Sequence, residues 1–173
     1  VHRTLNAQSR EVDGQIVQLY DPVNHELSDD QTPLRYGVGM MADTRWIKIK
    51  RPIIIVGGEL TMESLDLTYN QMAKFYEAPY QVKANGGMFL IDDFGRQQVS
   101  PKDLLNRWIV PLEKKYDFMT LANGRKIELP FNVLIIFSTN MDPADLVDDA
   151  FMRRIKYKIE VGNPTLEQYR ELM

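Results

Sequence analysis

The sequence predicts an α/β fold with a mainly parallel sheet, and three observations support this prediction. Short apolar strands alternate with helices that have capping residues at their starts, the order typical of strand–helix–strand units. Two of the strands end in polar side chains, as strands do where a parallel sheet forms a site. The chain has 173 residues, 44% of them hydrophobic, which suffices for the core of about one domain.

The first half of the chain contains several strand signals. Residues 15–20 alternate between polar and apolar side chains, with turn residues on both sides. The run 45–60 predicts an alternating strand, a proline break and a fully apolar strand, and 87–92 predicts a buried strand. Residues 23–44 favour a loop. The stretch 61–79 is ambiguous, because its second half, Tyr69 to Tyr76, suits a helix while its first half alternates as in a strand.

The second half alternates helices and strands more clearly. Ser100 and Pro101 predict the start of a helix that Pro111 should kink or shorten. Asn123-Gly124 predicts the turn of a β-hairpin. A buried strand over 132–140 should follow. Beyond it we expect a helix capped by Asp142 that ends in a basic pair, a strand over 155–161 and the start of a final helix.

The polar ends of two of these strands could carry chemistry. Asp92-Asp93 follow one strand and Ser138-Thr139-Asn140 end another. If the strands are neighbours, carboxylates and an amide converge at one edge of the sheet. Carboxylate oxygens suit Mg²⁺, and a second carboxylate can orient or deprotonate a water. Taken singly, the aspartates could merely end a strand, and Asn140 could simply form a turn.

Composition and charge exclude several classes of protein and partner. The net charge is −3, from 21 basic and 24 acidic residues, so nucleic acid and anionic membranes are not expected partners. The chain has no cysteine, which excludes disulfides and thiolate metal sites. No apolar run approaches the roughly 20 residues of a membrane span, and the amino terminus has no signal-peptide pattern. We therefore expect a cytoplasmic protein.

Four segments, in order, resemble the AAA+ ATPases and within them the MoxR-type branch. The run 88-MFLIDDFGRQ-97 is similar to a Walker B strand, and 132-NVLIIFSTN-140 to a sensor 1 strand. The run 145-DLVDDAFMRRI-155 resembles the helix that carries an arginine finger. The hairpin around Asn123-Gly124 is similar to the pre-sensor-1 hairpin, and 57–79 occupies the place of an insert in the second helix. The resemblance implies a three-layer P-loop NTPase-like fold.

The resemblance also implies roles for individual residues. Asp92 would hold Mg²⁺, and Asp93 would polarise the attacking water, although the family pattern has Glu at this second position. Asn140 would position that water and sense the γ-phosphate of ATP. Arg153 or Arg154 would reach a neighbouring subunit, and the two alternatives stay open. The implied partners are ATP, a protein client and further copies in a ring, by resemblance a hexamer.

The phosphate-binding part of such a site is missing from the sequence. No G-x-x-x-x-G-K-[ST] loop precedes Asp92. In the family this loop, a central strand and a helix come before the first segment seen here. We therefore expect residues 1–163 to be the later part of an AAA+ core and 164–173 to begin a truncated helical lid. Both ends suggest a piece of something longer, and this chain alone should bind nucleotide weakly or not at all.

Two functional interpretations follow. One is enzymatic: part of an ATPase that remodels or chaperones proteins as an oligomer. The other is a degenerate AAA+-like module kept for assembly, which the missing phosphate loop favours. A phosphotransfer receiver is a third class, but it would need a further Asp and a Lys at later strand ends, and Asn140 stands at the analogous place.

Overall fold

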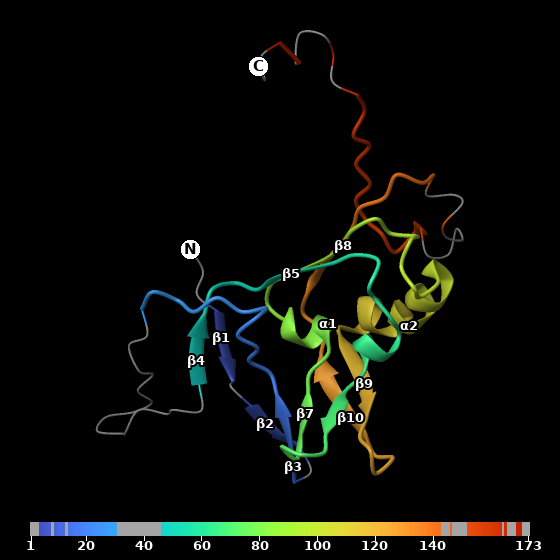
Figure 1. Ribbon diagram of the computed structural model, residues 1–173. Helices are drawn as coiled ribbons and strands as arrows, with labels where there is room; N and C mark the ends of the chain where they lie inside the picture. Colours follow the sequence, from blue (N-terminus) through green and yellow to red (C-terminus); the bar gives the residue numbers. More distant parts are fainter. Residues whose placement is uncertain are drawn as a thin grey trace.

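The computed structural model describes residues 4–7, 9–12, 14–30, 46–142, 146, 152–163, 165 and 169–170. Its centre is a parallel sheet of three strands in the order β11–β8–β5 (Figure 1). These strands are β5 (Ile53–Val56), β8 (Met88–Ile91) and β11 (Leu134–Phe137). This confirms the predicted α/β class with a parallel sheet. In the described chain β11 is an edge strand, with β8 as its neighbour.

Helix α2 (Pro101–Lys114) covers one face of this sheet. It begins as predicted, since the Ser100 side chain accepts a hydrogen bond from the backbone N–H of Asp103. Pro111 does not shorten it, because the helix continues to Lys114 and ends at Lys115, a left-handed cap residue with φ 63°. The core between helix and sheet contains Phe89, Ile91, Leu104, Leu105 and Trp108.

The second core lies between a four-stranded sheet and the predicted hairpin. The sheet has the order β2–β3–β7–β6, with β2 (Ser9–Val12), β3 (Gln15–Gln18), β6 (Thr68–Asn70) and β7 (Phe75–Glu77). The hairpin joins β9 (Tyr116–Thr120) to β10 (Lys126–Pro130) through the Asn123-Gly124 turn. Val17, Tyr76, Met119 and Leu129 are buried in this core. Strands β1 (Thr4–Ala7) and β4 (Trp46–Ile49) form a separate antiparallel pair.

The helix suggested for Tyr69 to Tyr76 is wrong, because these residues form the β6–β7 hairpin. The Asn70 side chain accepts hydrogen bonds from the N–H groups of Met72 and Ala73, which closes a turn. Lys74 adopts φ 56°, and the rings of Tyr69 and Tyr76 then lie 4.7 Å apart across the hairpin. Local turn chemistry and cross-strand packing thus outweigh the helical spacing.

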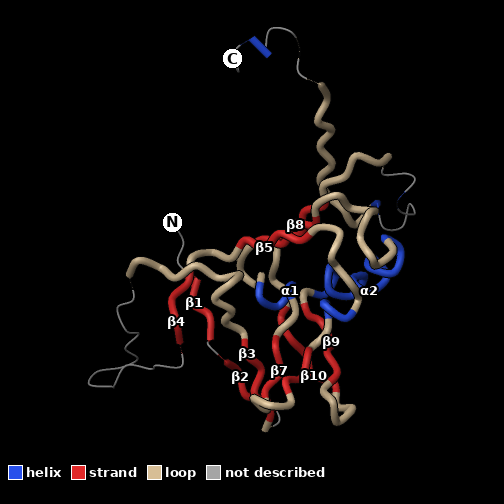
Figure 2. Tube along the Cα trace, viewed as in Figure 1, coloured by secondary structure: helices blue, strands red, loops and turns tan. Residues whose placement is uncertain are grey.

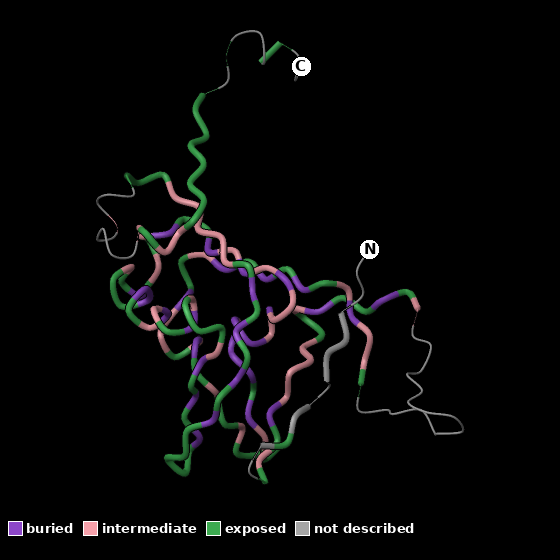
Figure 3. The backbone as a smooth tube through the Cα atoms, turned by 180° about the vertical axis from the view of Figure 1, so that it is seen from behind, coloured by how far each residue is buried: buried purple, intermediate pink, exposed green. Residues whose placement is uncertain are grey.

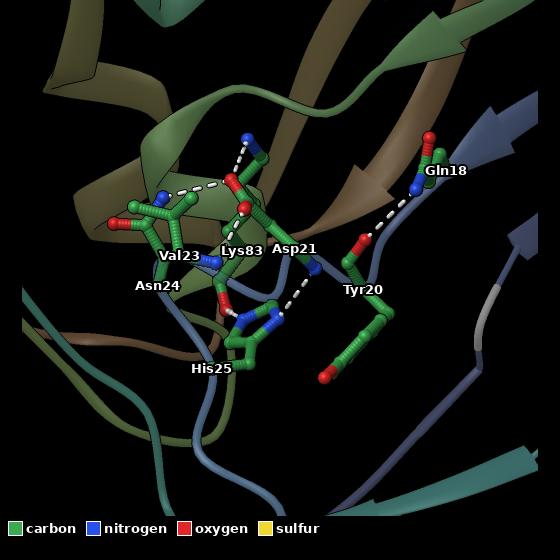
Figure 4. A network of polar contacts seen from close by, with 7 residues as sticks. All are labelled: Gln18, Tyr20, Asp21, Val23, Asn24, His25 and Lys83. Atoms are coloured by element: carbon green, nitrogen blue, oxygen red, sulfur yellow. Dashed lines mark hydrogen bonds and ion pairs between the residues drawn. The ribbon is translucent and has the colours of Figure 1, made fainter.

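The connection from β7 back to the parallel sheet contains little helix. It consists of α1 (Tyr80–Lys83), and the short 3₁₀ helix η1 (Glu63–Leu65) precedes the β6–β7 hairpin. The Asp21–His25 loop is fixed to α1 by polar contacts (Figure 4). Lys83 Nζ lies 2.6 Å from Asp21 Oδ2, and His25 Nε2 lies 2.8 Å from the Lys83 carbonyl oxygen.

The network around Asp21 and His25 alters two pKa values. Burial alone would raise the pKa of Asp21, but hydrogen bonds from Lys83, Asn24 and Val23 outweigh it and lower that pKa to about 2. Burial lowers the pKa of His25. Because His25 Nδ1 accepts a hydrogen bond from the backbone N–H of Asp21, Nε2 carries the proton and donates a hydrogen bond to the carbonyl oxygen of Lys83. The network therefore requires a neutral imidazole.

The strand predicted over 155–161 is also wrong, since none of these residues forms a strand. Ile155 packs against the main core, but 156–163 are exposed and lead away from the body (Figures 1 and 3). An alternating pattern needs a neighbouring strand to form a sheet, and none lies beside it in the described chain. The helix predicted from Asp142 falls mostly outside the described residues, as does most of the final helix.

Candidate functional site

The candidate site is the loop that follows β8. The N–H of Asp92 donates to the Val56 carbonyl oxygen at 2.8 Å, so pairing with β5 continues to this residue. Asp93 then turns the chain with φ 50°, a left-handed conformation uncommon outside glycine. Gln97 holds the loop: its Nε2 donates to the carbonyl oxygens of Asp92 (2.7 Å) and Asp93 (3.1 Å). Both aspartates are exposed and fixed at the backbone.

The end of β11 lies beside this loop. Parallel pairing sets Phe137 against Ile91, so the next residues, Ser138 and Asp92, are neighbours across the two strands. The Ser138 hydroxyl donates a short hydrogen bond to Asp92 Oδ1. In the backbone, the N–H of Phe94 donates to the Ser138 carbonyl oxygen at 2.7 Å. A carboxylate and a hydroxyl are thus held together at the carboxyl edge of the sheet, where α/β proteins place their sites.

Two of the predicted site residues, Asp92 and Asp93, lie together on this loop. Asn140 is exposed two residues beyond Ser138. In the described part of the chain, no hydrogen bond joins Asn140 to either aspartate. The strand preceding Asn140 is not buried as predicted, because the side chains of β11 are half-buried or exposed.

The arginine pair lies at a different place in the fold. Arg154 Nε donates to Glu113 Oε1 at 2.8 Å, and Arg154 Nη2 lies 2.7 Å from the same oxygen. Glu113 belongs to the last turn of α2, so Arg154 is engaged with its own chain. Arg153 is exposed.

The side chains of this site could bind a hard cation only together with ligands from outside the chain. Within the described ranges, no group of three or more His, Cys, Asp or Glu side chains could hold a metal ion. Asp92 and Ser138 offer a carboxylate and a hydroxyl oxygen. Mg²⁺ is commonly bound through one or two carboxylates, waters and the phosphates of a substrate. These residues therefore fit a Mg²⁺ ion that arrives with a phosphate ligand.

Sequence reasoning gave no role to Ser138 or Gln97. Ser138 could have been found by aligning the two apolar runs, since equal strand lengths before Asp92 and Ser138 place these residues in register. Gln97 gives no comparable signal, because its contacts depend on how the loop turns at Asp93 and Gly95.

Three comparisons with known proteins bear on the fold. No protein-family model matches the sequence, and a search of curated proteins finds no significant match. Among solved structures, the chain is similar to a cryo-EM-based structure of the complex between subunits BchI and BchD of magnesium chelatase, with a TM-score of 0.52 and 17% identity. That match covers 77% of this chain and 42% of the other.

NtrX from Brucella abortus is a weaker match. It has a TM-score of 0.47 at 17% identity, covering 60% of this chain and 24% of NtrX. NtrX has also been crystallised with ADP and with ATP. These neighbours are AAA+ ATPase-type proteins, and the chain spans less than half of their length. At such low identity the likeness to the magnesium chelatase structure shows the fold alone, which agrees with the P-loop NTPase-like architecture.

No helix among the described residues has the length and apolar character needed to cross a membrane.

Proposed function

We propose that this chain supplies the acidic edge of an AAA+ nucleotide site that binds and hydrolyses Mg-ATP. The observation that carries the proposal is the pairing of Asp92 with Ser138 at the carboxyl ends of two adjacent parallel strands. This is the position at which α/β sheets bind ligands. The low-identity likeness in fold supports the same class of protein.

In this proposal Asp92 holds Mg²⁺ through its waters, and Ser138 fixes the orientation of the Asp92 carboxylate. Bound Mg²⁺ would neutralise charge on the phosphate oxygens. Asp93 polarises the attacking water, and Asn140 positions it. The left-handed turn at Asp93 directs the chain out of the strand directly after the Mg²⁺ ligand. Asp93 is one methylene shorter than a glutamate, so we expect slow hydrolysis.

Arg153 or Arg154 would act on a neighbouring subunit's nucleotide, and both stay candidates. Arg154 forms an ion pair with Glu113 of its own chain, and this contact would have to break before Arg154 could reach across a boundary. Trans-acting arginines in nucleotide hydrolases contribute about 10³–10⁵ in rate. The proposed assembly is an oligomeric ring of the MoxR-like type that remodels or chaperones a protein client. Its client contacts would come from the β6–β7 and β9–β10 hairpins.

Most triphosphate contacts in such sites come from a glycine-rich loop and its lysine, which this sequence lacks. We therefore expect the chain by itself to bind Mg-ATP weakly, with Kd in the ~millimolar range. The second candidate function is a degenerate AAA+-like module kept for assembly. The two candidates differ in whether Asp92 contributes to nucleotide binding.

Calorimetric titration with ATP and Mg²⁺ separates these candidates. Asp92→Ala removes the proposed metal ligand, and Glu128→Ala removes an exposed carboxylate on β10 as a matched control. We expect weak binding by the wild type and the control, and none by Asp92→Ala. Mn²⁺ added with ATP should broaden the amide NMR signals of 92–97 and 138–140 first. Binding that is unchanged in Asp92→Ala, or broadening elsewhere, would contradict the proposed site.

A further inference from the structure

The sequence contains two Asn-Gly pairs, and the fold places them in opposite surroundings. Asn123-Gly124 lies in the turn of the β9–β10 hairpin, and Asn85-Gly86 lies in the turn between α1 and β8. Both glycines adopt a positive φ, 81° at Gly124 and 78° at Gly86, so they are alike in local backbone conformation. The two pairs differ in what holds them.

The first pair is exposed at a hairpin tip. Figure 2 shows this tip as the loop at the lower edge of the molecule, below β9 and β10, and both of its residues are exposed. Asn123 Oδ1 accepts a hydrogen bond from the backbone N–H of Arg125 at 3.0 Å. The Gly124 N–H donates to the Leu121 carbonyl oxygen at 2.8 Å. Both contacts stay within the turn, so they can open locally while the rest of the hairpin stays folded.

The second pair is fixed to another part of the fold. Asn85 Nδ2 donates to the Pro130 carbonyl oxygen at 2.7 Å, and Asn85 Oδ1 accepts from the backbone N–H of Asn132 at 2.7 Å. The Gly86 N–H donates to the Asn132 carbonyl oxygen, also at 2.7 Å. The connection between β10 and β11 therefore holds both ends of the side chain and the backbone nitrogen that follows it. These groups become free only if that connection separates from the α1–β8 turn.

An asparagine that precedes a glycine can lose its side-chain amide without an enzyme. The backbone nitrogen of the glycine attacks Cγ of the asparagine and gives up its proton, and a cyclic succinimide forms while ammonia leaves. Water then opens the ring at either carbonyl, which yields aspartate or isoaspartate. Glycine favours the attack, because it has no Cβ to hinder its nitrogen and its backbone turns freely. The reaction requires that the nitrogen and the asparagine side chain can leave their hydrogen bonds and approach each other.

We propose that Asn123 is a site of spontaneous deamidation and that the contacts of Asn85 protect it from the same reaction. Opening the hairpin tip is a local event, whereas opening the Asn85 turn separates two packed parts of the fold and costs more free energy. We therefore expect Asn123 to deamidate at least about tenfold faster than Asn85 in the folded chain. This inference does not depend on nucleotide binding, and its test contains no nucleotide.

The two products change the hairpin differently. Aspartate adds a negative charge next to Arg125 and Lys126 and leaves the path of the backbone intact. Isoaspartate routes the main chain through the side-chain carbon and so lengthens the turn by a methylene. The Leu121 N–H, which donates to the Arg125 carbonyl oxygen at 2.8 Å, then loses its register with that oxygen. Isoaspartate therefore loosens the end of the hairpin, where Leu121 and Ile127 are buried.

Mass spectrometry of the aged chain tests the difference between the two pairs. Trypsin, which cuts after lysine and arginine, yields the peptides 84–96 and 116–125, and each contains a single asparagine and no glutamine. A gain of mass in either peptide therefore reports one site, and isoaspartate elutes separately from aspartate. During incubation at mildly alkaline pH, the peptide 116–125 should gain mass first. In guanidinium chloride, which unfolds the chain, the two rates should agree within about twofold. Asn123→Gln should abolish the gain in 116–125 and leave 84–96 unchanged.

Three outcomes would overturn the proposal. The first is no gain of mass at Asn123 above the background in a sample digested without incubation. The second is an equal rate at Asn123 and Asn85 in the folded chain. The third is a difference between the two sites that persists unchanged in guanidinium chloride, because the neighbouring sequence and not the fold would then set the rates.

Discussion

The two faces of the β5–β8–β11 sheet have similar side chains and opposite surroundings. On the covered face, Ile54, Phe89 and Ile91 are at most 1% exposed, because α2 packs against them. On the opposite face, which we call the open face, Ile53 and Ile55 are more than half exposed although they alternate with Ile54 in the same strand. Apolar sequence alone therefore does not determine burial, since burial also needs a second layer that covers the face.

The energetic difference between the faces should be large. Phe89→Ala removes a fully buried ring that lies 5.8 Å from Trp108 and leaves a cavity. We expect a loss of roughly 3–5 kcal/mol in the free energy of unfolding. Ile55→Ala on the open face should cost less than about 1 kcal/mol, since little apolar area returns to water. Urea denaturation of both variants measures the contrast, and similar losses would mean that the open face is covered in solution.

The sequence revealed the strands but could not reveal which face was open. The runs Ile53–Val56, Met88–Ile91 and Leu134–Phe137 are continuously apolar, and such runs are typical of strands buried on both faces. The strands therefore lie where the sequence predicted them, but only one face of the sheet is buried. Only the placement of α1 and α2 on one side breaks the equivalence of the two faces.

The candidate site was partly predictable for a related reason. Polar residues directly after apolar strands mark the carboxyl edge, so Asp92 and Asp93 could be found from sequence alone. The contacts of Ser138 and Gln97 depend on register and on the turn at Asp93, which are tertiary features. The contact of Arg154 with Glu113 spans 41 residues of sequence and could not be inferred from local pattern.

At the amino-terminal end of the sheet, the residue before β8, Gly87, packs closely against the residue before β5, Pro52. A Cβ added at Gly87 would lie 2.0 Å from the Pro52 carbonyl oxygen, which is a backbone atom that cannot move aside easily. Gly87→Ala should therefore lower the free energy of unfolding by about 1–3 kcal/mol. Gly124→Ala gives a comparison without a clash, because no atom lies near its added Cβ, although its φ of 81° is itself unfavourable to alanine. Thermal melting of both variants separates the two effects. A larger loss in Gly87→Ala than in Gly124→Ala would assign the difference to the clash with Pro52.

The covered face also depends on α1, whose end is fixed by His25. Folding lowers the pKa of His25 below its ordinary 6.5, so the unfolded chain binds the proton more readily. Stability from this residue is therefore complete above pH 6.5 and is lost as the pH falls towards the folded pKa, by up to about 1.4 kcal/mol per pH unit. Asp21 stays ionised in this window, since its pKa is about 2. Denaturation between pH 7 and 5 should show this slope in the wild type and lose it in His25→Gln. An equal slope in both would assign the effect to another group.

The smallest effect on the free energy of unfolding is expected for a substitution on the open face. Leu134→Lys places a charge on the open face at a position that is 59% exposed, so the ammonium group can remain in water. We expect a change of no more than about 0.5 kcal/mol in the free energy of unfolding. Leu104→Lys, at a fully buried position of α2, is the matched variant and should prevent folding. A large loss in Leu134→Lys would mean that a segment already covers this face. A negligible loss would mean that this exposed face contributes little to the stability of the chain.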